Sequence, residues 1–379
     1  MNVLVLFHTR VNTGYAMAPL EKTFFEVASE LAGNQGDVHF AFSKYDGEQA
    51  SSLPENFENV FEISREKLLT TEGFKSALNE ILPLRLDLAF CFDLQVDGPV
   101  VKLLRAAKVK TVVSYWGATM SSKNKGLKLL AKKLEVALSF RKPNLFIFES
   151  EAMRYFAVNG RGIRYCNTTV IPTGVDESKF SPSKKDKESL CNEFGIPKIN
   201  KIAIYSGHME QRKGVEVIIR AVMSLYDNHG CDGWSFLICG NQPGEEKIFL
   251  DILSNHPASA NVIFCGYRSD IDRLMASSDV GIIASTGWDS FPMSALEMAA
   301  SGLPIIVSNL QGLAETVESN VTGLMFTPGD YESLADILVK MQDKNFPLES
   351  MSVQARKRII DGYTIPHQKT RLLDALRRI

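Results

Sequence analysis

The chain has 379 residues, of which 45% are apolar and 23% are charged. This composition is typical of a globular protein of two or three domains and excludes a disordered chain, a fibrous repeat and a small disulfide scaffold. Lysine and arginine number 42 against 44 aspartate and glutamate residues, so the net charge of -2 lacks the basic excess of proteins that bind nucleic acid non-specifically. We predict no nucleic-acid partner.

The N-terminal apolar run, Val3 to Phe7, is shorter than the hydrophobic region of a signal peptide and has no basic residue before it. No stretch reaches the ~18 consecutive apolar residues that a membrane-spanning helix needs. The six cysteines are not paired at spacings typical of metal or redox sites, which favours free thiols in a reducing compartment. We expect a cytoplasmic protein whose membrane contact, if any, is peripheral.

Short apolar runs alternate with helical patterns in the first half of the chain. The runs predict strands that are buried on both faces, as in a parallel sheet. They are Val3–Phe7, Val38–Phe42, Leu86–Phe92, Thr111–Tyr115 and Leu145–Phe148. Apolar residues spaced by three and four predict crossover helices over Pro19–Leu31, Glu66–Leu82 and Pro99–Ala107.

The segment from Lys123 to Lys142 contains seven basic residues and one acid, Glu135. We expect a leucine stripe of its helix to pack on the sheet, formed by Leu127, Leu130, Leu134 and Leu138. The other side mixes lysines with Leu129, Val136 and Phe140, which resembles a membrane-surface helix. Two interpretations stay open: peripheral contact with an anionic membrane, and a solvated basic helix beside an acceptor groove.

From Lys201 the same alternation begins again. Strands are predicted at Ile202–Tyr205, Phe236–Cys239, Val262–Phe264, Val280–Ala284 and Pro304–Val307. Helices are predicted at Lys213–Tyr226, Glu245–Leu253, Ile271–Ala276, Met293–Ala300 and Tyr331–Met341. The polar stretch 179–200 has the composition of a linker, so we predict domains over residues 1–180 and 181–364. A final helix over 365–379 closes the second domain or packs back on the first.

The fold class is therefore α/β, with two doubly wound, Rossmann-like domains that face one cleft. Ligands of open α/β sheets bind at the carboxyl ends of the strands, so function is expected in the loops that follow strands.

The loop after Ile202–Tyr205 carries a glycine, Gly207, and two cations, Arg212 and Lys213, before a helix begins. Cations beside a helix N-terminus can bind a diphosphate without a metal. A cationic surface turn, in which Gly214 eases entry to the helix, explains the same residues equally well.

Two acids, Asp289 and Glu297, follow the strand Val280–Ala284 at a spacing of eight. A helix that begins near Met293 would point its free amides at a ligand of Asp289, and Glu297 one turn further could accept hydrogen bonds from hydroxyls. The alternative is that Asp289 caps a turn and Glu297 faces solvent. Because Glu297 lies in an apolar helix, where an unpartnered carboxylate is costly, we favour a functional role.

These motifs together resemble the retaining glycosyltransferases of family four, also described as glycosyl transferases group 1, with the two-domain GT-B architecture. Besides the Asp289 to Glu297 motif, the resemblance rests on blocks in the family's order at 171–176, 261–267, 312–317 and 322–324. It implies a retaining, metal-independent hexosyltransferase. The donor would be a nucleotide-diphosphate sugar, UDP-sugar first and GDP-mannose next, used as a co-substrate with no further cofactor. The acceptor would be a hydroxyl of a glycan, a lipid-linked sugar or a small molecule in cell-envelope polysaccharide or glycoconjugate synthesis.

The resemblance also implies roles for individual residues. Lys213 and Arg212 would stabilise the leaving diphosphate, and Asp289 would hold the transferred sugar. The nucleotide sugar would be bound by Gly14, Gly207, His208, Tyr267, Arg268, Phe291, Met293, Ser294 and Glu297. Within this set, Glu297 would bind the ribose hydroxyls, Tyr267 and Arg268 the base, and the amides of Met293 and Ser294 the diphosphate.

Three positions depart from the family pattern. His208 stands where the family has an arginine, Asp289 replaces the usual glutamate, and Trp116 stands where many members have a histidine. The pair Asp270 and Asp272 resembles a metal site of another glycosyltransferase architecture, but the start of a helix explains acids there, and we predict no metal. The alternatives are a GT-B sugar-nucleotide epimerase or phosphorylase, a non-catalytic nucleotide-sugar-binding module, and a nicotinamide dehydrogenase, which the missing Gly-x-Gly-x-x-Gly motif disfavours.

Overall fold

The chain is described by a computed structural model that covers residues 1–15, 17–118, 120 and 124–379. It divides into two compact units, described below one at a time. Unit 1 comprises Met1–Thr173 and Ile365–Ile379, and unit 2 comprises Gly174–Thr364. The division after Thr173 lies a few residues before the predicted boundary at 180.

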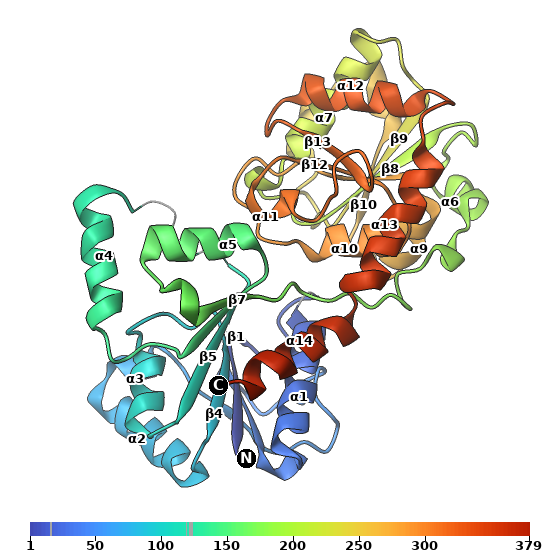
Figure 1. The fold of residues 1–379 in the computed structure, drawn as a ribbon. Helices are drawn as coiled ribbons and strands as arrows, with labels where there is room; N and C mark the ends of the chain where they lie inside the picture. The colour runs from blue at the N-terminus through green and yellow to red at the C-terminus, as the bar shows by residue number, and fades with distance from the viewer. Residues whose placement is uncertain (16, 119, 121–123) are drawn as a thin grey trace. The chain divides into compact units, whose positions relative to one another are not determined.

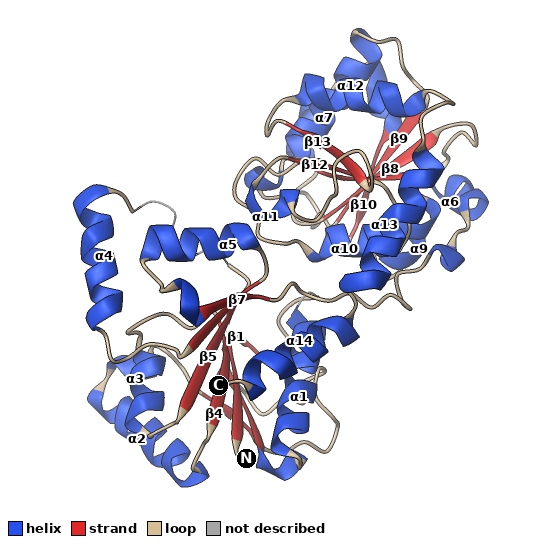
Figure 2. Cartoon of the chain, viewed as in Figure 1, coloured by secondary structure: helices blue, strands red, loops and turns tan. Residues whose placement is uncertain are grey.

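Unit 1 is built on a seven-stranded parallel sheet in the order β3-β2-β1-β4-β5-β6-β7 (Figures 1 and 2). Its strands are β1 (Val3–Arg10), β2 (Val38–Lys44), β3 (Val60–Glu62), β4 (Leu88–Phe92), β5 (Thr111–Trp116), β6 (Leu145–Phe148) and β7 (Thr168–Val170). Its α-helices are α1 (Met17–Ala32), α2 (Thr71–Ile81), α3 (Pro99–Ala106), α4 (Gly126–Leu138), α5 (Glu151–Phe156) and α14 (Ile365–Arg377).

Unit 2 contains a six-stranded parallel sheet in the order β10-β9-β8-β11-β12-β13. Its strands are β8 (Lys201–Ser206), β9 (Trp234–Cys239), β10 (Val262–Gly266), β11 (Val280–Ile283), β12 (Ile305–Ser308) and β13 (Gly323–Phe326). Its α-helices are α6 (Lys187–Phe194), α7 (Val215–Asp227), α8 (Lys247–Ile252), α9 (Ile271–Ser277), α10 (Met293–Ala300), α11 (Gln311–Ala314), α12 (Tyr331–Gln342) and α13 (Leu348–Gly362).

Each sheet of this kind buries both faces, and β8 shows how. Ile202 and Ile204 belong to one buried cluster, whereas Ala203 and Tyr205 belong to the cluster on the opposite face. Successive side chains of a strand point to opposite faces, so a strand covered on both sides needs apolar residues at every position. The apolar runs of the sequence therefore predicted the central strands well, and the two-domain α/β prediction is confirmed.

The C-terminal helix α14 packs on α1 within unit 1 (Figure 1). Leu372, Leu373 and Leu376 enter the same buried cluster as Phe24 and Val27 of α1. The chain thus leaves unit 1 after β7, builds unit 2, and returns to complete the core of unit 1.

The predicted packing of the basic helix is wrong. Within α4, Val136 is buried, while the leucine stripe that we expected to pack on the sheet is exposed, namely Leu127, Leu130, Leu134 and Leu138. Helical periodicity defines both faces of this helix but does not say which one is buried. Lys123, which begins the basic segment, lies outside the described residues. Within the described part of the chain, none of the helices combines the length and apolar character that a membrane crossing requires.

Candidate functional site

Strands β8 and β11 are neighbours in the unit 2 sheet, at the point where the strand order reverses. The chain places β9 and β10 on one side of this pair and β12 and β13 on the other. In open α/β sheets of this order, ligands bind outside the carboxyl ends of the strands at such a switch point. Both loops singled out in the sequence, 207–214 after β8 and 284–292 after β11, begin there.

An ion pair joins these two loops. Lys213 Nζ lies 2.9 Å from Asp289 Oδ2, and the side chains are only 16% and 6% exposed. Ser285 Oγ donates a hydrogen bond of 2.8 Å to the same carboxylate oxygen. Because an ammonium group has three N–H donors, Lys213 can hold Asp289 and still donate to an anion in front of it. The structure thus brings two of the predicted site residues into direct contact.

The backbone fixes Lys213 at this position. The carbonyl of Arg212 accepts hydrogen bonds from the amides of Thr286, at 2.7 Å, and Gly287, at 3.2 Å. Gly214 follows with a φ of +73°, and a Cβ there would lie 1.8 Å from the carbonyl oxygen of Ala284. Only glycine allows this close approach.

The side chain of Arg212 contacts residues other than Asp289. Its Nε lies 2.7 Å from Glu210 Oε2, and its guanidinium stands 5.7 Å from the centre of the Trp288 ring. A 3.4 Å contact joins the guanidinium to the carbonyl of Trp288. Arg212 is therefore next to the ion pair in the chain, but its guanidinium contacts Glu210 and Trp288.

Gly207 and His208 lie where β8 ends. The amide of Gly207 donates to the carbonyl of Cys239 at 3.1 Å, and the Tyr205 hydroxyl donates to the carbonyl of His208 at 2.6 Å. Burial raises the pKa of Tyr205, so its hydroxyl stays a neutral donor. The His208 side chain is exposed, which leaves it accessible to a ligand.

Helix α10 begins at Met293, as predicted, directly after Pro292. The amides of Met293 and Ser294 belong to its first turn, where the helix itself offers no acceptor. Glu297 is buried one turn later at 4% exposure. Phe291, by contrast, is a core residue, since its buried ring stacks on Tyr363 at 5.8 Å. The predicted ligand contact of Phe291 stays a prediction, since the stacking involves the ring and leaves the backbone of this residue in the loop before α10.

Tyr267 and Arg268 follow β10 with different surroundings. Tyr267 is 67% exposed. Arg268 bonds Asp270 and Glu193 at 2.8 Å each, and its guanidinium holds the pKa of Asp270 at about 2. Arg273 bonds the same two acids. Asp270 stands at the N-cap position of α9, but its carboxylate binds these arginines and does not cap the helix.

Among the residues described, no group of three or more His, Cys, Asp or Glu side chains is placed to hold a metal ion.

The sheet of unit 1 has the same kind of switch point as the sheet of unit 2. Its strand order reverses between the neighbouring strands β1 and β4. Gly14 lies beyond β1 with a φ of +69°, and a Cβ there would meet nothing within 4 Å. Asp93 follows β4 with a φ of +52° and accepts the Gly117 amide at 2.9 Å. Burial raises the pKa of Asp93 to about 7. Asp93 and His8 line the same narrow cavity, together with Arg65.

The sequence analysis did not single out Asp93. The sequence nevertheless marks this residue, because an acid directly after a buried apolar strand stands at the carboxyl end of the sheet, where ligands bind.

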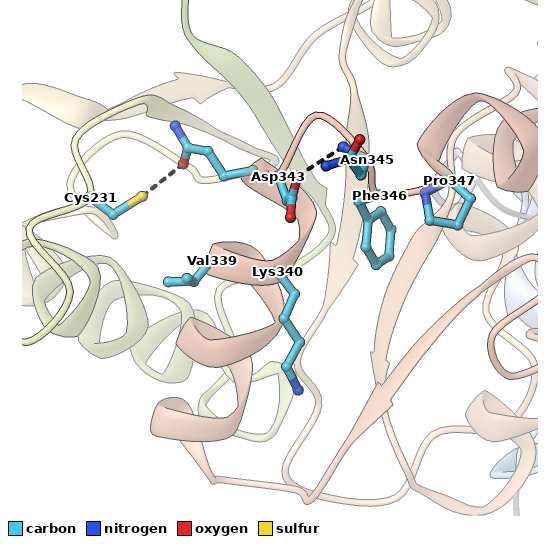
Figure 3. A pocket seen from close by; sticks show the side chains of 8 residues that line it. Cys231, Val339, Lys340, Asp343, Asn345, Phe346 and Pro347 are labelled. Atoms are coloured by element: carbon cyan, nitrogen blue, oxygen red, sulfur yellow. Dashed lines mark hydrogen bonds between the residues drawn. The ribbon is translucent and has the colours of Figure 1, made fainter.

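Figure 3 shows a surface hollow of unit 2, beside the segment that leads into β9 and the end of α12. It is lined by Cys231, Val339, Lys340, Gln342, Asp343, Asn345, Phe346 and Pro347. Cys231 precedes β9, and its Sγ lies 2.7 Å from Gln342 Oε1. None of the predicted site residues is among these eight described residues. The hollow is therefore separate from the candidate site.

Residues 186–358 match the sequence family described as Glycosyl transferases group 1. The UDP-Gal:alpha-D-GlcNAc-diphosphoundecaprenol alpha-1,3-galactosyltransferase of Escherichia coli is 26% identical over 67% of this chain and 65% of its own length. The lipopolysaccharide core biosynthesis mannosyltransferase LpsB of Rhizobium meliloti is 24% identical over 58% of this chain and 64% of its own length. The matches thus span less than two thirds of these relatives.

Solved structures resemble the whole chain. Anabaena HepE in complex with UDP has a TM-score of 0.79 at 19% identity and 100% coverage of both chains. A glycosyltransferase from Rickettsia africae has a TM-score of 0.83 at 17% identity, covering 99% of this chain and 98% of its own. These likenesses and the two parallel sheets show a two-domain α/β fold of the GT-B type.

The close approach at Gly214 generates a stability prediction. Gly214→Ala should lower the free energy of unfolding by about 2–4 kcal/mol, since a methyl group adds overpacking to left-handed backbone strain. Gly195→Ala is the matched control, because Gly195 also has a positive φ, +65°, but a Cβ there meets nothing within 4 Å. It should cost only ~1–2 kcal/mol. Equal losses in urea titrations of the two variants would contradict this account of the loop.

The half-buried Asp93 of unit 1 generates a pH prediction. An acid whose folded-state pKa is raised binds more protons folded than unfolded, so its contribution to stability falls as pH rises from its ordinary pKa near 4 to about 7. Between pH 5 and pH 8 this loss amounts to about 2–3 kcal/mol for Asp93. Asp93→Asn should flatten the pH dependence of the urea midpoint by a corresponding amount. An unchanged slope would show that Asp93 ionises freely in the folded protein.

Proposed function

We propose that this chain, whose residues 186–358 belong to the glycosyl transferases group 1 family, transfers a sugar from a nucleotide-diphosphate sugar to a hydroxyl acceptor. The single observation that carries the proposal is the buried contact between Lys213 and Asp289 at the switch point of the unit 2 sheet. A lysine ammonium held there by a carboxylate suits a diphosphate, which needs a fixed positive charge.

The donor groups are assigned as follows. Lys213 and the first-turn amides of Met293 and Ser294 bind the diphosphate, with Arg212 as a second cation. The carboxylate of Asp289 accepts hydrogen bonds from hydroxyls of the sugar while it orients Lys213. Glu297 binds the ribose and Tyr267 stacks on the base, for which its exposed ring is available. Arg268, which two acids hold, supports this loop more than it serves the base.

A UDP-sugar is the favoured donor, with GDP-mannose next. In support, HepE was solved with UDP and with UDP-glucose, and the Escherichia coli relative is named for UDP-Gal. The Rhizobium relative is named a mannosyltransferase.

The transfer is proposed to retain the anomeric configuration without a metal. The bond between the anomeric carbon and the β-phosphate oxygen breaks, and its electron pair stays on that oxygen. The acceptor hydroxyl attacks the same face, and its proton passes to a phosphate oxygen of the leaving diphosphate. The positive charge of Lys213 stabilises the charge that grows there, so that the protein supplies positioning and electrostatics. Turnover should then persist in the presence of a chelator.

We place the acceptor in unit 1, at the edge that carries Asp93. A glycan, a lipid-linked sugar or a small molecule fits the proposal. The relatives named for lipopolysaccharide core biosynthesis and for diphosphoundecaprenol support a role in cell-envelope synthesis. A cytoplasmic location is part of the same proposal. An epimerase or a non-catalytic nucleotide-sugar-binding module has less support, because the named relatives are transferases. Product analysis with and without acceptor distinguishes them.

Lys213→Ala should lower turnover ~100-fold or more, because it removes the donor aimed at the leaving phosphate. Release of UDP from UDP-glucose and UDP-galactose, with water as the acceptor, measures this loss before the natural acceptor is identified. Lys198→Ala is the control, since Lys198 also pairs with a carboxylate of unit 2, Glu188, but on the surface. Its turnover should equal that of the wild type. Full activity of a folded Lys213→Ala protein would refute the assignment.

Nucleoside diphosphates should stabilise the protein selectively. A ligand at ~100 times its Kd adds ~2.7 kcal/mol to folding, so the preferred diphosphate should raise the melting temperature most. We expect UDP to exceed GDP and ADP in a thermal-shift series, and the rise to shrink in Lys213→Ala. No shift with any nucleoside diphosphate would contradict a nucleotide-sugar site.

A further inference from the structure

Two cysteines of unit 2 lie side by side at the carboxyl ends of neighbouring strands. Cys239 is the last residue of β9, and Cys265 precedes the last residue of β10, which pairs in parallel with β9. Cys239 pairs with Gly266, and the register shifts just before this pair, so that β10 carries Cys265 as one extra residue. The two cysteines are far apart in the sequence, and the pairing of the strands brings them together.

Both side chains point to the same face of the sheet. Cys239 belongs to the buried cluster that also contains Leu237 of β9, and Cys265 packs against that cluster. A hydrogen bond between the two thiols raises the pKa of Cys239, and burial raises it further. The Cys265 thiol also contacts the carbonyl of Ile263 at 3.6 Å. The two sulfur atoms are therefore direct neighbours.

The spacing of the two strands suits a disulfide. Neighbouring strands lie ~4.8 Å apart, and the Cα atoms of a disulfide are usually ~4.4–6.8 Å apart. The thiols of Cys166 and Cys231, by comparison, bond the side chains of Asn167 and Gln342. The thiol pair at the ends of β9 and β10 can thus form a covalent bond without a rearrangement of the sheet.

The two thiols differ in exposure, which sets the order of their oxidation. Cys239 is only 1% exposed, whereas Cys265 is half-buried. Oxidation of cysteine requires access for the oxidant, so a peroxide reaches the Cys265 sulfur first. A sulfenic acid formed there lies beside a second thiol, which is the arrangement of redox-sensing cysteines. In a reducing compartment such disulfides are usually transient and regulatory.

We propose that Cys239 and Cys265 form a redox-sensitive modification site, which hydrogen peroxide converts reversibly to an intramolecular disulfide. The peroxide O–O bond breaks as the Cys265 thiol becomes a sulfenic acid, and one water leaves. The Cys239 sulfur then attacks the Cys265 sulfur, the S–O bond breaks, and the hydroxyl leaves with the proton of Cys239 as a second water. The two thiols together lose two electrons and two protons, and the peroxide is reduced to two waters.

The disulfide acts on the loops that carry the assigned nucleotide-binding residues. The carbonyl of Cys239 accepts the Gly207 amide at 3.1 Å, and a Cβ at Gly240 would lie 2.3 Å from the Gly207 carbonyl oxygen. An S–S bond of ~2.05 Å is shorter than any hydrogen bond, so its formation pulls the ends of β9 and β10 together. The movement displaces Gly207 and the loop with Tyr267. This consequence rests on the proposed function, whereas the modification itself does not.

Mass spectrometry of the full chain tests the modification. The protein is treated with hydrogen peroxide, its remaining thiols are alkylated in denaturant, and tryptic peptides are mapped with and without dithiothreitol. Lys247 lies between the two cysteines, so trypsin places them on separate peptides. We expect one cross-linked pair, containing Cys239 and Cys265, that dithiothreitol separates. Cys265→Ser should abolish the cross-link and leave Cys239 free to be alkylated. The matched control is Cys166→Ser, which removes an exposed thiol of unit 1 and should cross-link as the wild type does.

UDP binding measures the effect on the nucleotide site. The oxidised wild type should bind UDP about 10-fold more weakly than the reduced protein, which corresponds to the loss of roughly one hydrogen bond. Dithiothreitol should restore the affinity. Methionine sulfoxide needs its own reductases, so this recovery distinguishes the disulfide from oxidised methionines. Cys265→Ser should bind UDP equally before and after peroxide.

Two results would overturn the proposal. The first is a peptide map in which Cys239 and Cys265 both stay alkylated after peroxide, or in which either is linked to another cysteine, such as Cys191 of the same buried cluster. The second is a cross-linked protein that binds UDP as tightly as the reduced protein does. If neither form binds UDP, the proposed function fails, and the peptide map alone decides whether the modification site exists.

Discussion

The candidate site depends on one interaction, the ion pair between Lys213 and Asp289. The parallel pairing of β8 with β11 brings the carboxyl ends of two strands together although 76 residues separate the two side chains. Gly214 lets the first loop approach the second, and the Arg212 carbonyl is bound by amides of the second loop. A buried carboxylate is costly unless it has a partner, so Asp289 stabilises the ammonium of Lys213 at the place where an anionic ligand would arrive.

Each unit has an acid in the loop after the strand beyond the reversal of the strand order, but the two acids have different surroundings. Asp93 follows β4 and Asp289 follows β11, and each of these strands is the one beyond the reversal of the strand order. Asp93 accepts a backbone amide in a half-buried place, and desolvation raises its pKa to about 7. Asp289 meets an ammonium and a hydroxyl. The first environment suits an acid that exchanges a proton near neutral pH, and the second suits one that orients a cation.

The sequence was sufficient for the central strands and for most helices, because burial on both faces demands uninterrupted apolar runs. It was insufficient for β3, β7 and β13, each of only three or four residues. It could not show contacts with partners that lie far along the chain. Phe291 packs on Tyr363, and Arg268 pairs with Glu193, and neither contact could be read from the motifs that assigned these residues to the nucleotide sugar. The leucine stripe of α4 was visible as a pattern, but the burial of Val136 on the other face decided which way it points. Periodicity and motif spacing define candidates, whereas tertiary contacts select among them.

The most direct test of the central claim is a crystal structure of the full chain with UDP. The account predicts that the β-phosphate lies within hydrogen-bond distance of Lys213 Nζ and of the first-turn amides of α10, with Lys213 still in contact with Asp289. A pyrophosphate bound elsewhere, with the Lys213 and Asp289 loops untouched by the nucleotide, would contradict it.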